Sequence, residues 1–218
     1  MEERLKLLRE KIRAAAVKAG REPDSVGLIA VSKTRTTDEI RAAANLGLRD
    51  FGENYVQELV AKHDALKDEI SDLRWHFVGR LQTNKVKYIV PFVHLIHGVD
   101  SAALLYEIEK RARALRRSVD ALIQLNISDE KQKNGTDETG LREMAATPLQ
   151  FVRLRGLMGM AEHTDDAQAL RRQFSRLRQA LPPDWDVLSM GMSDDYEMAI
   201  AEGATLVRIG SALFGPRA

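Results

Sequence analysis

Residues 26–34 read VGLIAVSKT, in which an apolar run over residues 26–32 leads directly into a lysine and a threonine. A run without polar alternation is typical of a strand that is buried on both of its faces. Seven further apolar runs follow along the chain, and several of them are equally continuous. They lie at residues 48–52, 75–79, 95–99, 121–127, 154–160, 187–190 and 205–209.

Helical patterns separate these runs. Residues 36–39 (TTDE) have the spacing of a capping box, in which a hydroxyl and a carboxylate bind backbone N–H groups at the start of a helix. Further helices are expected at residues 54–68, 101–116, 138–146, 164–180 and 194–201. An additional helix is expected ahead of the first run, at residues 2–19, because its apolar residues share one face and Gly20 follows it.

Strands that alternate with helices pair in parallel, and eight such units close into a (β/α)8 barrel. We therefore predict an α/β fold, a single TIM barrel domain over residues 1–218 with an extra N-terminal helix. The alternative is a doubly wound open sheet. No G-x-G-x-x-G motif follows the first run, which argues against the dinucleotide-binding form of that sheet.

The composition excludes several classes of function. The chain has 33 basic and 32 acidic side chains, and its net charge of +1 does not favour nucleic acid or an anionic membrane as a partner. It has no cysteine, which excludes disulfides and thiol catalysis, and we expect no metal site. The N-terminus is too charged for a signal peptide, and residues 88–99 are too short to cross a bilayer, so we expect a cytoplasmic protein.

Two loops have the composition of a phosphate site. In (β/α)8 barrels such sites are often built from the loops after strands seven and eight, which here contain Gly191 and Ser193, then Gly210 and Ser211. Glycines let backbone N–H groups approach an anion, serines add hydroxyl donors, and a helix N-terminus adds unpaired N–H groups. Either serine alone is more often a turn or capping residue, but the pair in both loops favours a phosphate site.

Two cationic residues lie where a ligand would meet the barrel. Lys33 directly follows the first strand, where a desolvated amine becomes a nucleophile toward an aldehyde, and a solvated loop lysine is the alternative. Arg208 lies inside an apolar run, where an unpaired charge is costly. It either pairs with a neighbouring strand, for example with Glu53, or points at a ligand, and the spacing does not decide between the two.

Five motifs, in order along the chain, resemble the pyridoxal 5′-phosphate (PLP) homeostasis protein family, also called the proline synthetase co-transcribed homologues. They are residues 30–34 (AVSKT), 51–58 (FGENYVQE), 75–85 (WHFVGRLQTNK), 188–195 (LSMGMSDD) and 207–215 (VRIGSALFG). Together they span nearly the whole chain. The resemblance implies the fold-type III PLP barrel of the alanine racemase N-terminal domain.

The same resemblance implies a set of cofactor-binding residues. They are Lys33, Asn54, His76, Ser193, Arg208, Gly210 and Ser211. Lys33 is expected to form the internal aldimine with PLP, and Arg208 to face the pyridine nitrogen. The serines and Gly210 are expected to hold the phosphate, and the remaining two residues to lie near the cofactor. Many members have threonine where this chain has Ser211, and the hydroxyl is kept.

Arg208 also bears on activity. A guanidinium cannot accept the proton of a pyridinium, so it would keep the ring nitrogen unprotonated and weaken carbanion stabilisation. We therefore expect a protein that holds PLP for vitamin B6 homeostasis, without robust turnover and without catalytic residues. We also expect a monomer, with PLP-dependent apoenzymes as candidate recipients of the cofactor.

Two enzymatic alternatives stay open. A weak PLP-dependent amino-acid racemase needs a second acid or base on the opposite face of the cofactor. The related racemases take that group from an added domain, which we expect this chain to lack, so that Tyr55 or His76 would have to substitute. The other alternative is a Schiff-base aldolase that uses Lys33 on a phosphosugar.

Overall fold

Eight parallel strands form a closed barrel in this computed structural model, which describes residues 1–128 and 135–216. The strands pair in chain order, and the eighth pairs with the first. They are β1 (Gly27–Val31), β2 (Asp50–Glu53), β3 (Arg74–Phe77), β4 (Leu95–Val99), β5 (Val119–Gln124), β6 (Val152–Met158), β7 (Val187–Ser189) and β8 (Leu206–Ile209). The pairing of β1 with β8 excludes the open sheet and confirms the predicted (β/α)8 barrel.

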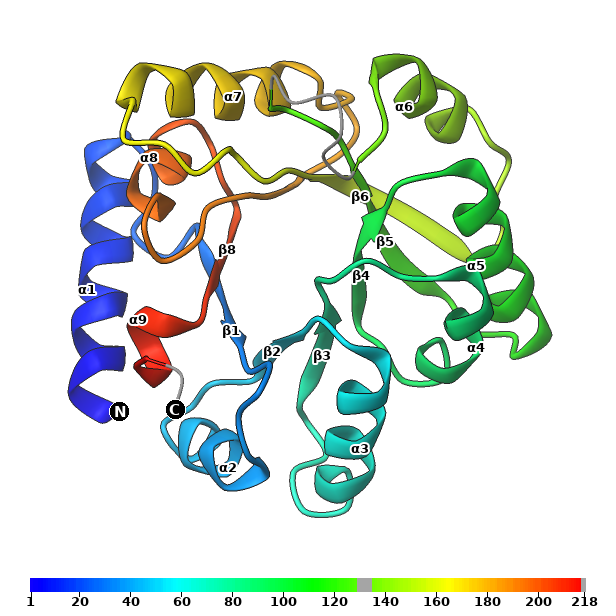
Figure 1. Cartoon of the computed structure of the whole chain (residues 1–218), viewed down its shortest axis with the longest axis horizontal. Coiled ribbons are helices and arrows are strands. Elements are labelled where there is room, and N and C mark those ends of the chain that lie inside the picture. The colour runs from blue at the N-terminus through cyan, green and yellow to red at the C-terminus, as the bar shows by residue number, and fades with distance from the viewer. Residues whose placement is uncertain (129–134, 217–218) are drawn as a thin grey trace.

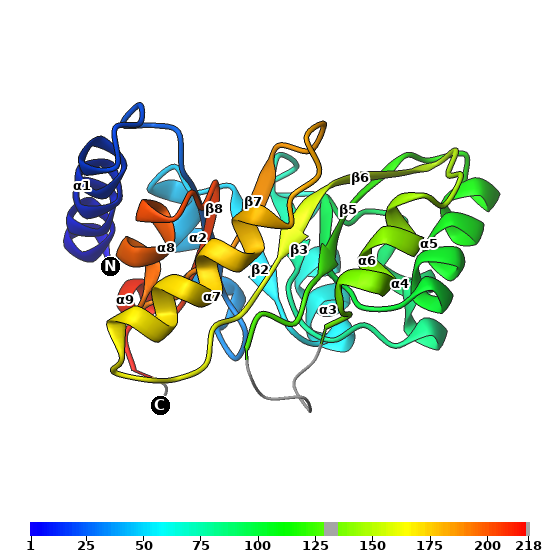
Figure 2. The same ribbon diagram turned by 90° about the horizontal axis from the view of Figure 1, so that it is seen from above.

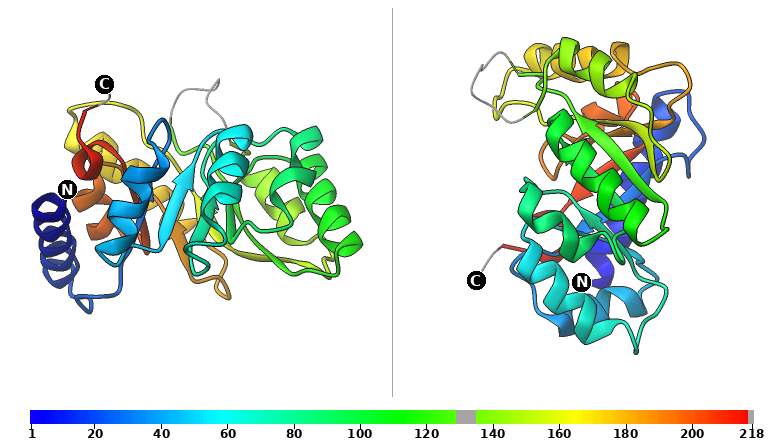
Figure 3. Two further views of the ribbon diagram at one scale, coloured as in Figure 1. Left: turned by 90° about the horizontal axis from the view of Figure 1, so that it is seen from below. Right: turned by 90° about the vertical axis from the view of Figure 1, so that its right-hand side faces the viewer.

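Helices surround the strands, as Figure 1 and the two views of Figure 3 show. They are α1 (Glu2–Lys18), α2 (Thr37–Asn45), α3 (Val56–Leu66), α4 (Val86–Ile89), α5 (Ala102–Ala114), α6 (Glu138–Ala145), α7 (Ala167–Gln179), α8 (Tyr196–Ala201) and α9 (Ser211–Phe214), with a 3-10 turn η1 (Thr83–Lys85). The sequence patterns did not predict η1 and α4, because these elements are too short to show a helical period. No helix among the described residues has the length and apolar character needed to cross a membrane.

The extra N-terminal helix lies outside the ring of strands. Leu5, Leu8, Ile12 and Ala16 of α1 are buried, as their shared face predicts. That face packs against α8 and α9, and α1 is the outermost element at one side of the molecule (Figures 1 and 2). The helix therefore supports the two elements that follow β7 and β8.

The capping box at the start of α2 is present as predicted. The Thr36 hydroxyl accepts a hydrogen bond from the Glu39 backbone N–H, and the Glu39 carboxylate accepts one from the Thr36 N–H. These bonds satisfy two N–H groups that have no partner within the helix. They also fix the point at which the chain leaves the loop after β1.

The barrel interior is apolar in one layer and polar in the next. Leu95, Leu122 and Met158 form a small cluster of their own with Val187 and Leu206. Side chains two residues further along a strand face the same side, one layer nearer to its C-terminal end. In that next layer the buried side chains are polar, namely His97, Gln124, Ser189 and Arg208. Polar groups at this depth need hydrogen-bond partners, and they lie next to the end of the barrel where ligands are expected.

Candidate cofactor site

A cavity of about 250 Å³ lies at the C-terminal ends of the strands. Its volume is just below the range of about 300–1,000 Å³ that is typical of sites for drug-sized ligands. It brings together six of the seven residues that the sequence singled out, namely Lys33, Asn54, Ser193, Arg208, Gly210 and Ser211. The remaining lining residues are Val31, Arg35, Val78, Met160, Met192 and Asp194.

Lys33 directly follows β1 and is half-buried at the cavity wall. The next residue, Thr34, has a backbone φ of 64°, a left-handed conformation that is unfavourable for a β-branched residue. Its backbone N–H donates a 2.6 Å hydrogen bond to the Glu58 carboxylate on α3, which holds this conformation. The backbone around the candidate nucleophile is therefore fixed from outside the cavity.

The Glu58 carboxylate that binds the Thr34 N–H also belongs to a buried ionic cluster. The Lys62 amine donates to the carboxylates of Glu58 (2.6 Å) and Glu53 (2.7 Å) and to the Ser32 carbonyl oxygen (2.6 Å). Burial raises the pKa of the Glu53 carboxyl, against the effect of its bonds with Lys62 and Ser32. Since Glu53 pairs with Lys62, the suggested ion pair between Glu53 and Arg208 is wrong.

Arg208 is buried on β8 and still reaches the cavity. Its guanidinium donates to the Ser189 carbonyl oxygen and hydroxyl, both at 2.7 Å, and to the Gly159 carbonyl oxygen at 3.1 Å. Burial lowers the pKa of Arg208 to about 10, so the group remains a cation at neutral pH. The three oxygen acceptors hold this charge in place at the cavity wall.

The loops after β7 and β8 meet at the cavity. The hydroxyl groups of Ser193 and Ser211 lie 3.0 Å apart, and the Ala212 N–H donates to the Ser193 oxygen at 3.4 Å. A Cβ atom on Gly210 would lie 3.3 Å from the Val31 carbonyl oxygen, so a larger residue would be crowded there. Because α8 has six residues and α9 four, hydroxyl and backbone N–H donors, rather than helix dipoles, are what this part offers an anion.

Asn54 and His76 have different locations. Asn54 follows β2 and lines the cavity, and Gly79 packs against it so closely that a Cβ atom there would lie 2.2 Å from the Asn54 carbonyl oxygen. His76 is not among the residues that line the cavity. It is 3% exposed inside the barrel and binds Asp50 and His97 instead. The expectation that His76 lies at the cofactor is therefore corrected, because it lies deeper than the cavity.

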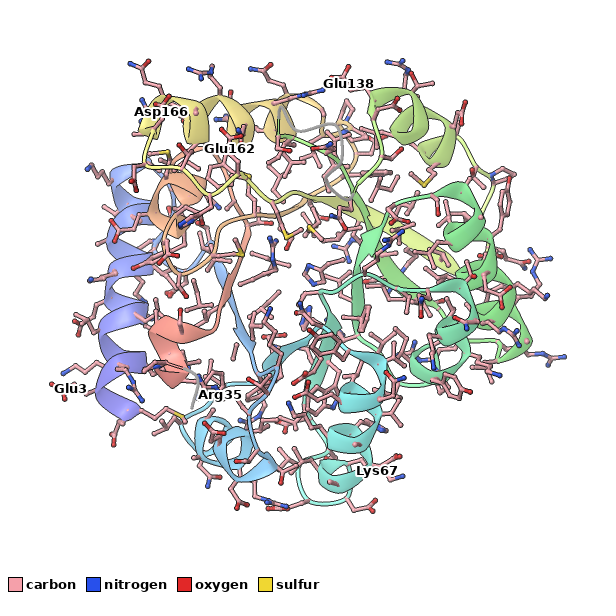
Figure 4. All side chains as sticks on the ribbon, in the orientation of Figure 1. Glu3, Arg35, Lys67, Glu138, Glu162 and Asp166 are labelled. Carbon is pink, nitrogen blue, oxygen red and sulfur yellow. The ribbon has the colours of Figure 1, made fainter. Side chains whose placement is uncertain are left out.

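Sequence patterns missed several lining residues. Arg35 is the most informative: its guanidinium donates to the Gly215 carbonyl oxygen at 2.5 Å, lies over the Phe214 ring and sits beside the end of α9 (Figure 4). The feature of the sequence that could have identified Arg35 is its position two residues after Lys33. Met160 and Met192 are 38% and 41% exposed and form apolar walls that only the closed barrel brings together. Among the described residues no group of three His, Asp or Glu side chains is arranged to hold a metal ion.

The fold and the site together define the class of protein: a closed (β/α)8 barrel with an amine, a buried guanidinium and a pair of hydroxyls in one cavity at the C-terminal ends of its strands. Residues 4–218 match the family model of the alanine racemase N-terminal domain. The chain belongs to that family and, within it, to the pyridoxal phosphate homeostasis proteins. It is 43% identical to the protein of that name from Aquifex aeolicus, over 99% of this chain and 97% of the relative. The identity to the Pseudomonas aeruginosa protein is 44%, over 95% and 91%.

Solved structures agree with this assignment. The chain is similar to PipY of Synechococcus elongatus, which was solved with PLP bound, at 38% identity and a TM-score of 0.86, over 98% of this chain and 99% of PipY. The crystal structure of an unknown protein from Bifidobacterium adolescentis has a TM-score of 0.91 at 36% identity, over 97% of this chain and 93% of that protein. A histidine racemase from Leuconostoc mesenteroides, 13% identical with a TM-score of 0.75, shares the fold over 99% of this chain and 57% of its own.

Proposed function

We propose that this chain binds PLP as a Schiff base on Lys33 and serves vitamin B6 homeostasis without robust catalytic turnover. One observation carries the proposal: a single cavity contains the lysine that follows β1, the hydroxyls of the loops after β7 and β8, and the buried guanidinium of β8. The name of the relatives and the PLP bound in PipY support it.

The residues present fit this cofactor group by group. The neutral amine of Lys33 would attack the aldehyde carbon, and loss of one water molecule would leave the imine. The hydroxyls of Ser193 and Ser211, with backbone N–H groups beside Gly210, would donate to the phosphate. The side chains of Val78 and Met160 would cover the ring.

Arg208 supports a holding function over a catalytic one. PLP acts as an electron sink when its ring nitrogen is protonated, usually beside a carboxylate. A guanidinium has only donors, so Arg208 would donate to that nitrogen and keep it unprotonated. Of the two suggested substitute acids, Tyr55 is 59% exposed, and neither it nor His76 lines the cavity. The racemase alternative therefore gains no support from these two residues.

The wider role is delivery or buffering of PLP. We propose a single-domain, cytoplasmic monomer that releases the cofactor to PLP-dependent apoenzymes. Lys33 is only half-buried, which supports reversible binding and release of PLP, because water can reach the imine and hydrolyse it.

The direct test is the absorption spectrum of the purified protein before and after PLP is added. The wild-type protein should develop a visible band, and Lys33→Ala should not. Lys67→Ala is the matched control, since this exposed lysine pairs with Asp64 and does not line the cavity, so its loss should leave the band unchanged. Borohydride reduction followed by peptide mass measurement should place the PLP adduct on Lys33. A wild-type protein that stays colourless, or an adduct elsewhere, would contradict the proposal, and trapping of a phosphosugar instead would favour the aldolase.

A further inference from the structure

Beneath the cavity, hydrogen bonds in series connect Arg208 with Asp50. The Arg208 guanidinium donates to the Ser189 hydroxyl at 2.7 Å, and that hydroxyl lies 2.8 Å from Nδ1 of His97. Nε2 of His97 lies 3.0 Å from Nδ1 of His76, whose Nε2 lies 3.0 Å from the Asp50 carboxylate. These five residues, called the interior row below, belong to β8, β7, β4, β3 and β2, so the row crosses the barrel.

The two ends of the interior row allow one continuous direction of hydrogen bonding across the barrel. Arg208 can only donate, and the Asp50 carboxylate can only accept. In that direction His76 donates from Nε2 to Asp50 and accepts at Nδ1 from Nε2 of His97. Nδ1 of His97 then accepts from the Ser189 hydroxyl, whose oxygen accepts from Arg208. Both rings then donate from Nε2 and accept at Nδ1.

The electrostatics favour a neutral His97 and an ionised Asp50. Burial, with the nearby His76, Arg208 and His94, lowers the pKa of His97 well below its usual value, so this ring stays neutral. Burial opposes ionisation of Asp50, but the hydrogen bonds from Arg74 and His76 outweigh it and hold the pKa of Asp50 well below its usual range. The interior row therefore has a cation at one end, an anion at the other, and aligned dipoles between them, which strengthen one another.

Arg208 has no carboxylate among its hydrogen-bond acceptors, which are oxygens of Ser189 and Gly159. A buried cation without a paired anion is costly. We infer that Asp50, His76, His97 and Ser189 are positioning residues that fix the Arg208 guanidinium and supply its counter-charge from the far side of the barrel. This inference rests on the proposed function, in which Arg208 faces the ring nitrogen of PLP.

Through Asp50, the interior row extends to the N-terminal end of the barrel, on the other side from the cofactor cavity. It lies at the start of β2, its side chain is 26% exposed, and it lines a second cavity of about 240 Å³. Arginines dominate the charge of that cavity, namely Arg9, Arg13, Arg49 and Arg74. A change of charge at Asp50 is therefore expected to reach the cofactor cavity through the interior row.

Other charged or titratable groups face the interior row. The His94 ring is 5.3 Å from that of His76, and burial lowers the pKa of His94. Arg74 binds Asp50, and Asp120 acts electrostatically on His94. Asp195 acts in the same way on Arg208 from the loop after β7. None of these groups takes part in the four hydrogen bonds of the row. The effect of a substitution within the row can therefore be measured separately from the effect of a substitution in one of these groups.

The first experiment changes the far end of the interior row and measures the visible band of the PLP-loaded protein against pH. Asp50→Asn keeps an acceptor for His76 but removes the negative charge. The Schiff-base nitrogen should then lose its proton more easily. The midpoint of the pH titration of the visible band should therefore move to lower pH by roughly half a unit. Asp72→Asn is the matched control, because Asp72 is also paired with an arginine, Arg49, but lies outside the row.

Two substitutions of His97 separate coupling from local packing. His97→Asn can still accept from Ser189 but cannot reach His76, whereas His97→Gln can still donate to His76 but cannot reach Ser189. Both break the row, so both should shift the midpoint as Asp50→Asn does. Wild-type midpoints in Asp50→Asn and in His97→Asn would overturn the inference, since Arg208 would then need no support beyond Ser189.

A measurement without cofactor keeps the two proposals distinguishable. Nitrogen NMR of the histidine rings in the PLP-free protein should show His97 neutral at pH 7, with its proton on Nε2. Because Arg208 lowers the pKa of His97, Arg208→Met should raise it. A His97 proton on Nδ1, or an unchanged pKa in Arg208→Met, would contradict the interior row even if PLP binds Lys33. A missing visible band in the wild-type protein would instead contradict the proposed function.

Discussion

The hydroxyl groups of Ser193 and Ser211 lie 3.0 Å apart although they follow different strands, β7 and β8. The two loops meet because β7 and β8 are neighbours in the barrel. Beside the Gly210 backbone, the pair offers an anion two hydroxyl donors at one point of the cavity wall. Lys33, which also lines the cavity, would then hold the aldehyde of the same ligand.

Loss of these hydroxyls should weaken PLP binding through its phosphate. A hydrogen bond to a charged group contributes about 1.5–3 kcal/mol, so Ser193→Ala or Ser211→Ala should each raise the Kd for PLP roughly tenfold or more. Ser211→Thr keeps the hydroxyl and should bind PLP like the wild-type protein. Pyridoxal, which has no phosphate, should bind all three variants and the wild type equally. Titration by absorbance tests this, and an equal loss for pyridoxal would argue against a phosphate contact.

The contact between Glu58 and the Thr34 N–H should matter for the formation of the imine. Glu58→Ala removes the acceptor that holds the left-handed Thr34 beside Lys33 and leaves Lys62 with one carboxylate fewer. We expect slower appearance of the visible band and a Kd for PLP that rises roughly three- to tenfold. Gln57→Ala, an exposed change on the same helix, is the control. Stopped-flow absorbance measures the rate, and equal rates in both variants would mean that the backbone at Lys33 needs no such anchor.

The carboxylate of Asp50 should make stability depend on pH in a defined direction. Its pKa in the folded chain lies below the unfolded value of 3.8, so its contribution is complete above that value and is lost as the pH falls toward the folded pKa. Asp50→Asn should therefore lower the free energy of unfolding by about 1–2 kcal/mol at pH 7, with the difference shrinking below about pH 4. Urea unfolding at pH 7 and pH 3 measures this. If the difference in free energy of unfolding between Asp50→Asn and the wild type grew as the pH fell, the predicted direction of the pH dependence would be wrong.

Much of the fold could be predicted from local patterns. The run at residues 26–32 and its seven successors coincide with the eight strands, with small shifts at their ends, because strands buried on both faces read as apolar runs. The capping box of Thr36 and Glu39 also formed as expected, since it involves only residues three positions apart. The four-residue helices α4 and α9 carry too few positions for a period to be visible.

The site was only partly predictable. Lys33, Ser193 and Ser211 could be selected because they follow strands, and strand ends meet at one face of a barrel. His76 was placed near the cofactor by the family resemblance, but it lies within β3, binds His97 and Asp50, and does not line the cavity. Arg35 was missed because its role depends on the end of the chain, where it binds the Gly215 carbonyl oxygen.

The sequence by itself determined where strands and helices form and which amine follows the first strand, because those features depend on neighbours along the chain. Only the tertiary structure decided that Arg208 is linked to Asp50 rather than to Glu53. Such partners are set by which side chains point into the barrel and at what depth, and both are defined only once β8 pairs with β1 and the ring closes. Hydrogen bonds act over about 3 Å, so a row that crosses the barrel cannot exist before that closure.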